Sequence, residues 1–184
     1  MTTALVCIDF INEIVDSTGK LASKGYYAFT QKHGTLENLA RRQAEVRGAG
    51  GQVIHVHLGF AANYTDHPAS SLLLGGARAG KILLLGTPST AIHTSVAPQG
   101  GDIIMVKKRI SAFYGTSLEL TLRSLGTSEL IIAGVSTDLA VQSAARDAHD
   151  RDFVVKIASD ACAAATDQDH DVALQNLAKF TKVI

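Results

Sequence analysis

The sequence predicts an α/β fold in which a mostly parallel sheet lies between layers of helices. Five short apolar runs recur along the 184 residues, at 4–8, 53–58, 103–106, 130–133 and 153–158. Because these runs are continuous rather than alternating, they are typical of strands buried on both faces, as in a parallel sheet. Stretches with helical spacing separate them, and strands that alternate with helices form open α/β sheets with right-handed crossovers.

Four stretches carry the apolar or small residues of a buried helix face. They are 35–47, 116–125, 140–148 and about 168–180. The second begins with Thr-Ser-Leu-Glu, which has the spacing of a capping box. The glycines at positions 48 and 126 are good helix stops. These helices are the expected crossovers between strands.

One segment breaks the alternation. All three prolines and several glycines fall between Phe60 and Gly101. An irregular stretch of roughly forty residues is uncommon in a compact domain and is usually functional. We therefore expect one domain over 1–184, with an irregular lid or interface insertion at about 60–101; a flexible surface loop is the alternative. Within it, 81–85 could add a short strand, and the apolar tract 82–85 would be economically buried in a subunit interface.

Composition excludes several classes of function. The 46% of hydrophobic residues can form a core without disulfides, and 17 basic residues balance 17 acidic ones. The basic surface of a nucleic-acid or anionic-membrane binder is therefore missing. No apolar stretch approaches the roughly 20 residues of a membrane span, no basic segment of a secretion signal is present, and no glycine-rich phosphate loop occurs. We expect a cytoplasmic protein that binds a small-molecule substrate, no nucleic acid, no membrane and no cofactor.

The residues that end the predicted strands are the candidate site, because ligands of open α/β sheets bind outside the carboxyl ends of the strands. Asp9 and Lys107 follow the first and third runs, and His57, 134–137 and Asp160 end the others. A carboxylate at a buried strand end needs a partner to stay ionised, and Lys107 is the obvious one. The pair could perform acid–base chemistry, or it could be an ion pair that only ties two loops together.

Four motifs occur in the order and spacing of a known superfamily. They are Ala-Leu-Val-Cys-Ile-Asp-Phe at 4–10, Lys-Lys-Arg-Ile-Ser-Ala-Phe-Tyr-Gly-Thr-Ser-Leu at 107–118, Gly-Val-Ser-Thr-Asp-Leu-Ala-Val at 134–141 and Asp-Ala-Cys at 160–162. The sequence resembles the isochorismatase-like hydrolases, the cysteine hydrolase superfamily that includes nicotinamidases, carbamoylsarcosine amidohydrolases and isochorismatases. The resemblance covers nearly the whole chain apart from 60–100. It implies a three-layer Rossmann-like fold with a six-stranded sheet, and a homodimer or higher homo-oligomer.

The resemblance also implies roles for single residues. Asp9 resembles the family's general acid/base carboxylate, and Lys107 resembles the lysine that pairs with it, with the adjacent Lys108 as the alternative. The Val135–Ser136 bond lies where the family has a non-proline cis peptide, which helps to aim backbone N–H groups at the substrate oxyanion.

Two departures from the family bear on the chemistry. The family's nucleophilic cysteine belongs six residues after Gly134, where this sequence has Ala140. A methyl group cannot act as a nucleophile, and neither Cys7, inside the first predicted strand, nor Cys162 is expected to replace the missing thiol. The family's nicotinamidases place an Asp-x-His pair just after the second strand, where this sequence reads His-Leu-Gly-Phe. No metal site is therefore expected.

Three interpretations follow. The first is a cysteine-independent hydrolase, similar to the isochorismatases, which lack the nucleophile and hydrolyse a vinyl ether. In that scheme Asp9 protonates the substrate and then assists water, while Lys107 tunes its pKa. The second is a nicotinamidase-type amidohydrolase whose nucleophile has been replaced by Ala140. The third is a catalytically inactive small-molecule binding protein. We take the first as the prediction.

The pocket walls are expected to come from side chains beside the motifs. They are Phe10, Asn12, Phe113, Tyr114 and Thr137. Phe113 could equally be ordinary core packing.

Overall fold

A computed structural model describes residues 2–184 and contains one six-stranded sheet in the order β3-β2-β1-β4-β5-β6. Every neighbouring pair is parallel. The strands are β1 (Thr2–Ile8), β2 (Gln52–Leu58), β3 (Ile103–Lys107), β4 (Thr127–Gly134), β5 (Val154–Ile157) and β6 (Lys182–Val183). The α/β fold with a parallel six-stranded sheet is thus confirmed. Only the two-residue β6 has no counterpart among the apolar runs.

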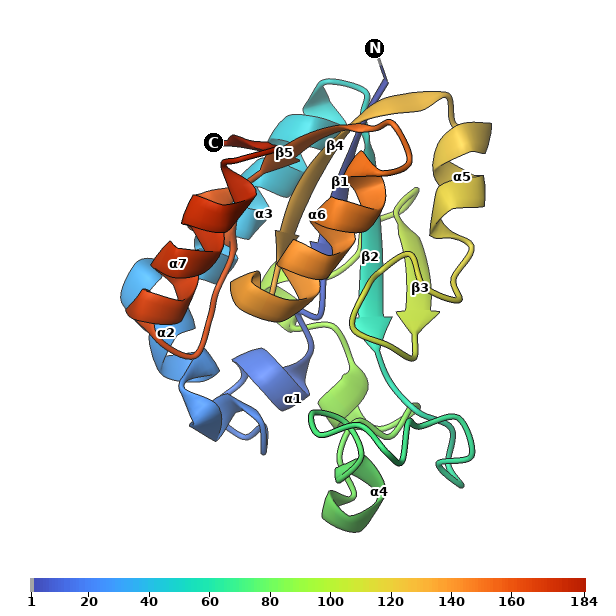
Figure 1. Ribbon diagram of the computed structural model, residues 1–184, viewed down its shortest axis with the longest axis vertical. Helices are drawn as coiled ribbons and strands as arrows, with labels where there is room; N and C mark the ends of the chain where they lie inside the picture. The colour runs from blue at the N-terminus through green and yellow to red at the C-terminus, as the bar shows by residue number, and fades with distance from the viewer. Residues whose placement is uncertain (1) are drawn as a thin grey trace.

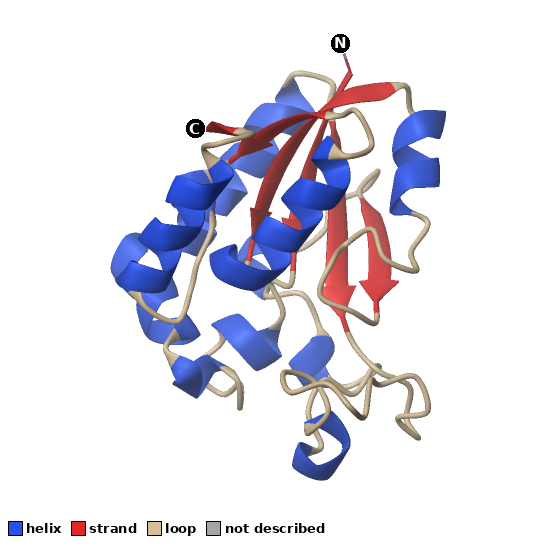
Figure 2. Ribbon diagram, in the orientation of Figure 1, coloured by secondary structure: helices blue, strands red, loops and turns tan. Residues whose placement is uncertain are grey.

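Helices cover both faces of this sheet (Figures 1 and 2). All four predicted helices are present: α3 (Thr35–Gly48), α5 (Leu118–Ser124), α6 (Gln142–His149) and α7 (Asp167–Leu177). Two of them begin later than expected. The Thr116 hydroxyl accepts the Leu118 N–H at 3.2 Å, so this threonine closes a turn before α5 rather than capping it. Residues 137–141 form a π-helical turn that leads into α6.

The alternation of side chains along β1 divides the core between the two faces. Leu5 and Cys7 pack with α3 on one face, while Ala4, Val6 and Ile8 pack with α5 and α6 on the other. The central strand is therefore apolar on both sides, which is the physical reason for its continuous apolar run.

Three short elements that the sequence analysis did not predict lie between β1 and α3. They are α1 (Asn12–Val15), the 3₁₀ turn η1 (Ala22–Lys24) and α2 (Tyr26–His33). Gly25 joins the last two with a φ of 110°, and a Cβ there would lie 2.2 Å from the Ala165 carbonyl oxygen. Only glycine combines this backbone angle with so close an approach. The segment lies below the carboxyl end of β1 in Figure 1.

The segment 59–102 is irregular, as expected, and contains only α4 (Ala77–Gly80) and the 3₁₀ turns η2 (Pro88–Thr90) and η3 (Thr94–Val96). The strand expected at 81–85 is wrong. A single bridge between Phe60 and Leu84 forms there, because Lys81 and Leu83 have positive φ angles that a strand cannot contain. Within the tract 82–85, Leu83 is buried by its own chain at 1% exposed, whereas residues 82, 84 and 85 are half-buried.

None of the helices within residues 2–184 is long and apolar enough to cross a membrane.

Candidate active site

A buried ion pair lies at the carboxyl end of the central strands. Asp9 directly follows β1, and its Oδ2 lies 2.7 Å from Nζ of Lys107, the last residue of β3. The Leu58 N–H, at the end of β2, donates to Oδ1 of Asp9 at 2.7 Å. Asp9 and Lys107 are 4% and 1% exposed. Three neighbouring parallel strands therefore bring a carboxylate, its counter-ion and a backbone donor to one point.

The ammonium of Lys107 has a full set of acceptors. Besides Asp9, it donates to the carbonyl oxygens of Ile110 at 2.8 Å and Arg109 at 3.2 Å. Lys108 turns away and pairs with Asp66 at 2.8 Å. The sequence left open which of the two adjacent lysines pairs with Asp9. The structure decides for Lys107, because successive side chains point to opposite faces at the end of a strand.

The environment of Asp9 makes its carboxyl harder to ionise than that of an exposed aspartate. Burial raises the pKa of this carboxyl, and the charge of Lys107 with the Leu58 N–H opposes that rise only in part. The backbone of Asp9 has a φ of 63°, unusual for a residue other than glycine. A non-glycine residue in this conformation, with a perturbed carboxyl, is typical of functional sites.

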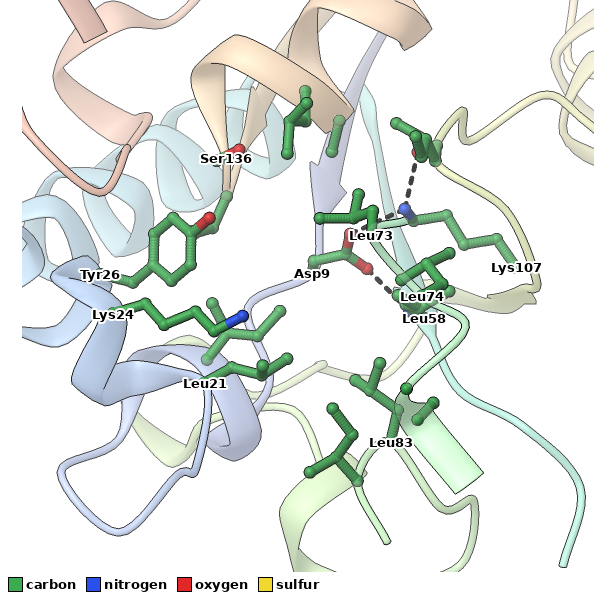
Figure 3. Close-up of a pocket in the computed structure, with 18 of the residues that line it drawn as sticks. Asp9, Leu21, Lys24, Tyr26, Leu58, Leu73, Leu74, Leu83, Lys107 and Ser136 are labelled. Carbon is green, nitrogen blue, oxygen red and sulfur yellow. Dashed lines mark hydrogen bonds and ion pairs between the residues drawn. The ribbon is translucent and has the colours of Figure 1, made fainter. Parts of the chain in front are cut away.

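The pair lines a cavity of about 400 Å³ (Figure 3). Three further residues named by the sequence analysis belong to the same wall: Val135, Ser136 and Ala140. The Val135–Ser136 peptide bond is cis. Most of the remaining wall is apolar and comes from the segments after β1 and β2.

Ala140 lies in the π-helical turn and places a methyl group in the cavity wall, where it is 4% exposed. Cys7 and Cys162 are both outside this wall and fully buried. Burial raises the pKa of each thiol to about 12. Neither cysteine is a reactive thiolate in this structure.

The sequence was compared with models of known protein families. Residues 3–184 match the model of the isochorismatase domain. The chain belongs to the isochorismatase family. Among curated proteins, it is 31% identical over 171 residues to the ureidoacrylate amidohydrolase RutB of Variovorax paradoxus (strain S110), covering 86% of this chain and 68% of that protein. It is 30% identical to the uncharacterized isochorismatase family protein YecD of Escherichia coli O157:H7, covering 96% and 87%.

A solved structure supports the same assignment. An isochorismatase family protein from Desulfovibrio vulgaris superposes with a TM-score of 0.87 at 27% identity, covering 99% of this chain and 93% of that one. The family fold therefore extends over the irregular segment as well as the sheet.

Two of the expected pocket residues of this family member lie outside the cavity wall. Phe10 is 2% exposed and packs in the core on the α3 face. Asn12 donates its side-chain N–H to the Pro88 carbonyl at 2.9 Å. Both follow Asp9, but the backbone turn at Asp9 directs the chain away from the strand axis, so proximity in sequence does not place them in the cavity.

The other three expected pocket residues also lie outside that wall. Phe113 is core, as the alternative interpretation held, with its ring centroid 6.3 Å from that of Phe153. Tyr114 is 67% exposed. The Thr137 hydroxyl lies 2.8 Å from Nδ1 of His170, which also does not line the cavity. Their motifs belong to the site through backbone and neighbouring residues rather than through these side chains.

Sequence reasoning missed several residues of the cavity wall. Lys24 and Tyr26 come from the turn η1 and the start of α2, and leucines 72–74 come from the irregular segment. No motif marked these residues, since a single lysine or leucine in an irregular segment has no periodicity. The early position of 12–33, directly after the Asp9 strand, was the one available signal.

Within residues 2–184 no group of three or more His, Cys, Asp or Glu side chains is arranged to hold a metal ion. His57 lies close enough to Asp9 to interact with its charge, and burial lowers the pKa of this histidine.

Proposed function

We propose that this isochorismatase-family hydrolase cleaves a small molecule by acid–base chemistry on Asp9 and Lys107, without a cysteine nucleophile. One observation carries the proposal: the Asp9 carboxyl, paired with Lys107 at 2.7 Å, lines the cavity together with the methyl group of Ala140. The site retains a proton-transfer group and has no nucleophilic atom at position 140.

Asp9 suits the role of a proton carrier. Its raised pKa keeps a larger protonated fraction available near neutral pH than an exposed aspartate has. As general acid it would protonate the linkage to be cleaved, and the bond from carbon to the leaving atom would then break. Water supplies the oxygen that joins the carbon and returns a proton to Asp9, so the group ends as it began. For a vinyl ether, the first proton goes to the enol-ether carbon.

Lys107 and the cis-peptide segment would position and stabilise charge. Lys107 is fixed by two backbone carbonyls, so it holds the Asp9 carboxyl in one orientation while that group loses and regains its proton. The Val135 N–H is already donated to the Ile8 carbonyl at 3.0 Å. The Ser136 N–H is therefore the group of this segment that we assign to a developing oxyanion.

The test is turnover of a panel of small carboxamides and isochorismate by the parent and by Asp9→Asn. We expect the parent to hydrolyse a member of the panel and Asp9→Asn to lower kcat by about 10²- to 10⁴-fold, the usual contribution of a general acid–base group. Asp102→Asn is the matched control, because it breaks a buried ion pair with Arg47, 2.6 Å long, outside the cavity wall. It should lose stability but keep kcat.

A third variant, Ala140→Cys, separates the alternatives. If only this variant cleaves amides, the site is an amidohydrolase that lacks its nucleophile, and the proposal is wrong. If the parent binds a panel member without turning it over, the protein is a binder and the proposal is wrong. If turnover is present but unchanged in Asp9→Asn, the acid–base role fails.

A further inference from the structure

The cavity has a second polar end, opposite the Asp9–Lys107 pair. Lys24, the last residue of η1, lines the cavity, and its ammonium extends into it below the Tyr26 ring (Figure 3). Among the interactions within residues 2–184, the Lys24 side chain has no ion pair and no hydrogen bond. An unpaired ammonium directed into a cavity is available to a ligand.

The charges of the cavity wall do not balance. Besides the phenol of Tyr26, its ionisable groups are one carboxylate, Asp9, and two ammonium groups, Lys107 and Lys24. Asp9 and Lys107 compensate each other at 2.7 Å, so among the wall residues the charge of Lys24 is left over, while Asp138, near Tyr26, lies outside the wall. Lys24 is exposed, so water screens its charge in the free protein, and a ligand that fills the mainly apolar cavity displaces part of that water. The cavity therefore favours one negative charge on its ligand.

Two neutral donors stand beside this charge. Burial raises the pKa of Tyr26, and the nearby Asp138 raises it further, so the phenol keeps its proton. The Tyr26 hydroxyl is directed toward Ser136, which is 6% exposed and lies on the same wall (Figure 3). A hydroxyl pair and an ammonium together match the two oxygens of a carboxylate.

The backbone holds this end in place. Gly25 separates Lys24 from Tyr26 and takes a φ of 110°, in a position where the Ala165 carbonyl leaves no room for a Cβ. The two side chains therefore project from a turn whose geometry is fixed by packing rather than from a free loop.

We infer that Lys24, with Tyr26 and Ser136, binds the carboxylate of the substrate, so that the enzyme acts on small monocarboxylates. The apolar body of such a molecule would lie against Leu21 and Leu74, and its scissile linkage would face Asp9. A volume of about 400 Å³ limits the ligand to a small molecule. This inference rests on the proposed function for the identity of the reacting end, but the carboxylate site itself is defined by binding.

The experiment is equilibrium binding, by calorimetry, of two acids and their uncharged amides: 4-methylpentanoate with 4-methylpentanamide, and benzoate with benzamide. We expect the parent to bind each acid about tenfold more tightly than its amide, as a charge-assisted contact gives. Lys24→Met should abolish the preference by weakening acid binding while amide binding stays unchanged. Lys24→Arg should retain most of it.

Lys179→Met is the matched control, since it removes the same charge at a residue that bonds only to Asn176 and lies outside the cavity wall. It should leave every affinity unchanged. The inference is overturned if the parent binds neither acid, if acid and amide bind equally, or if the Lys24 and Lys179 variants behave alike.

The failure of this inference and that of the proposed chemistry give different results. If Asp9-dependent turnover holds but no acid preference is found, only the carboxylate site is wrong. If the acid preference depends on Lys24 while Asp9→Asn leaves turnover unchanged, only the acid–base role is wrong.

Discussion

Removal of Lys107 alone is expected to destabilise the protein more than removal of the whole pair. In Lys107→Met, the Asp9 carboxylate loses its counter-ion inside a site where both groups are nearly inaccessible to water, 4% and 1% exposed. Breaking one partner of a buried pair costs about 3–5 kcal/mol in free energy of unfolding, because an uncompensated charge stays behind. The carbonyls of Arg109 and Ile110 also lose their donor.

The double variant Asp9→Asn/Lys107→Met leaves no buried charge. The introduced asparagine side chain would still accept the Leu58 N–H through its oxygen, a hydrogen bond that the parent carboxylate accepts at 2.7 Å. Replacement of a whole buried pair is often close to neutral. We therefore expect the double variant to be more stable than Lys107→Met, with a coupling free energy of at least about 2 kcal/mol between the two sites.

The sign of the pH dependence follows from Asp9. Its pKa is already raised by burial, and it rises further without the opposing charge of Lys107. A group whose pKa is higher in the folded state supports folding below its unfolded pKa and loses that support as the pH rises through the folded pKa. Lys107→Met should therefore be least destabilised at about pH 5 and most at about pH 8.

Urea unfolding of the parent, Asp9→Asn, Lys107→Met and the double variant at about pH 5 and pH 8 measures the unfolding free energies and hence the coupling free energy. Additive single effects, or a Lys107→Met loss independent of pH, would refute the account of a coupled buried pair.

Three further predictions concern other parts of the chain. In Ala140→Cys, iodoacetamide should alkylate the new thiol much faster than the two native cysteines, because the new thiol would line the cavity. Mass spectrometry of the labelled peptides measures the three rates. Equal labelling would contradict the placement of residue 140 in the cavity wall. Gly25→Ala should lower the unfolding free energy by about 2–4 kcal/mol, because the new Cβ would lie 2.2 Å from a carbonyl oxygen. The control Gly86→Ala, at a φ of 80° with open space around it, should lose only about 1 kcal/mol. Similar losses for both variants in thermal or urea unfolding would contradict the clash at Gly25. Burial lowers the pKa of His55, so its neutral form stabilises the fold above about pH 6.5, and this stabilisation is lost as the pH falls through the folded pKa. His55→Gln should therefore reduce the loss of unfolding free energy between about pH 6.5 and pH 5. An unchanged dependence of the unfolding free energy on pH would refute this prediction.

The sheet and the edge that carries the candidate site could be predicted because they follow from short-range rules. A strand buried on both faces must be apolar along its whole length, and the residue that ends it must lie at the carboxyl edge. Asp9 and Lys107 were therefore placed together from two strand ends about a hundred residues apart in the sequence. The motif around Ala140 was identified by its order and spacing, and its backbone does border the cavity.

Tertiary structure alone decided which side chains complete the site. The choice between Lys107 and Lys108 depended on which face of β3 meets Asp9, and one residue reverses that face. Aromatic residues beside the motifs turned into the core or solvent, because the backbone changes direction after each strand.

Lys24 and Tyr26 show most clearly that the sequence alone could not assign side chains to the cavity wall. Lys24 and Tyr26 reach the cavity from a segment with no apolar period, through a glycine turn packed against Ala165, 140 residues later in the chain. By itself, the sequence determined the fold, a pairing of Asp9 with a lysine at 107 or 108, and the absence of a thiol at position 140. The charge that faces this pair across the cavity was decided by long-range packing, which leaves no local pattern in the sequence.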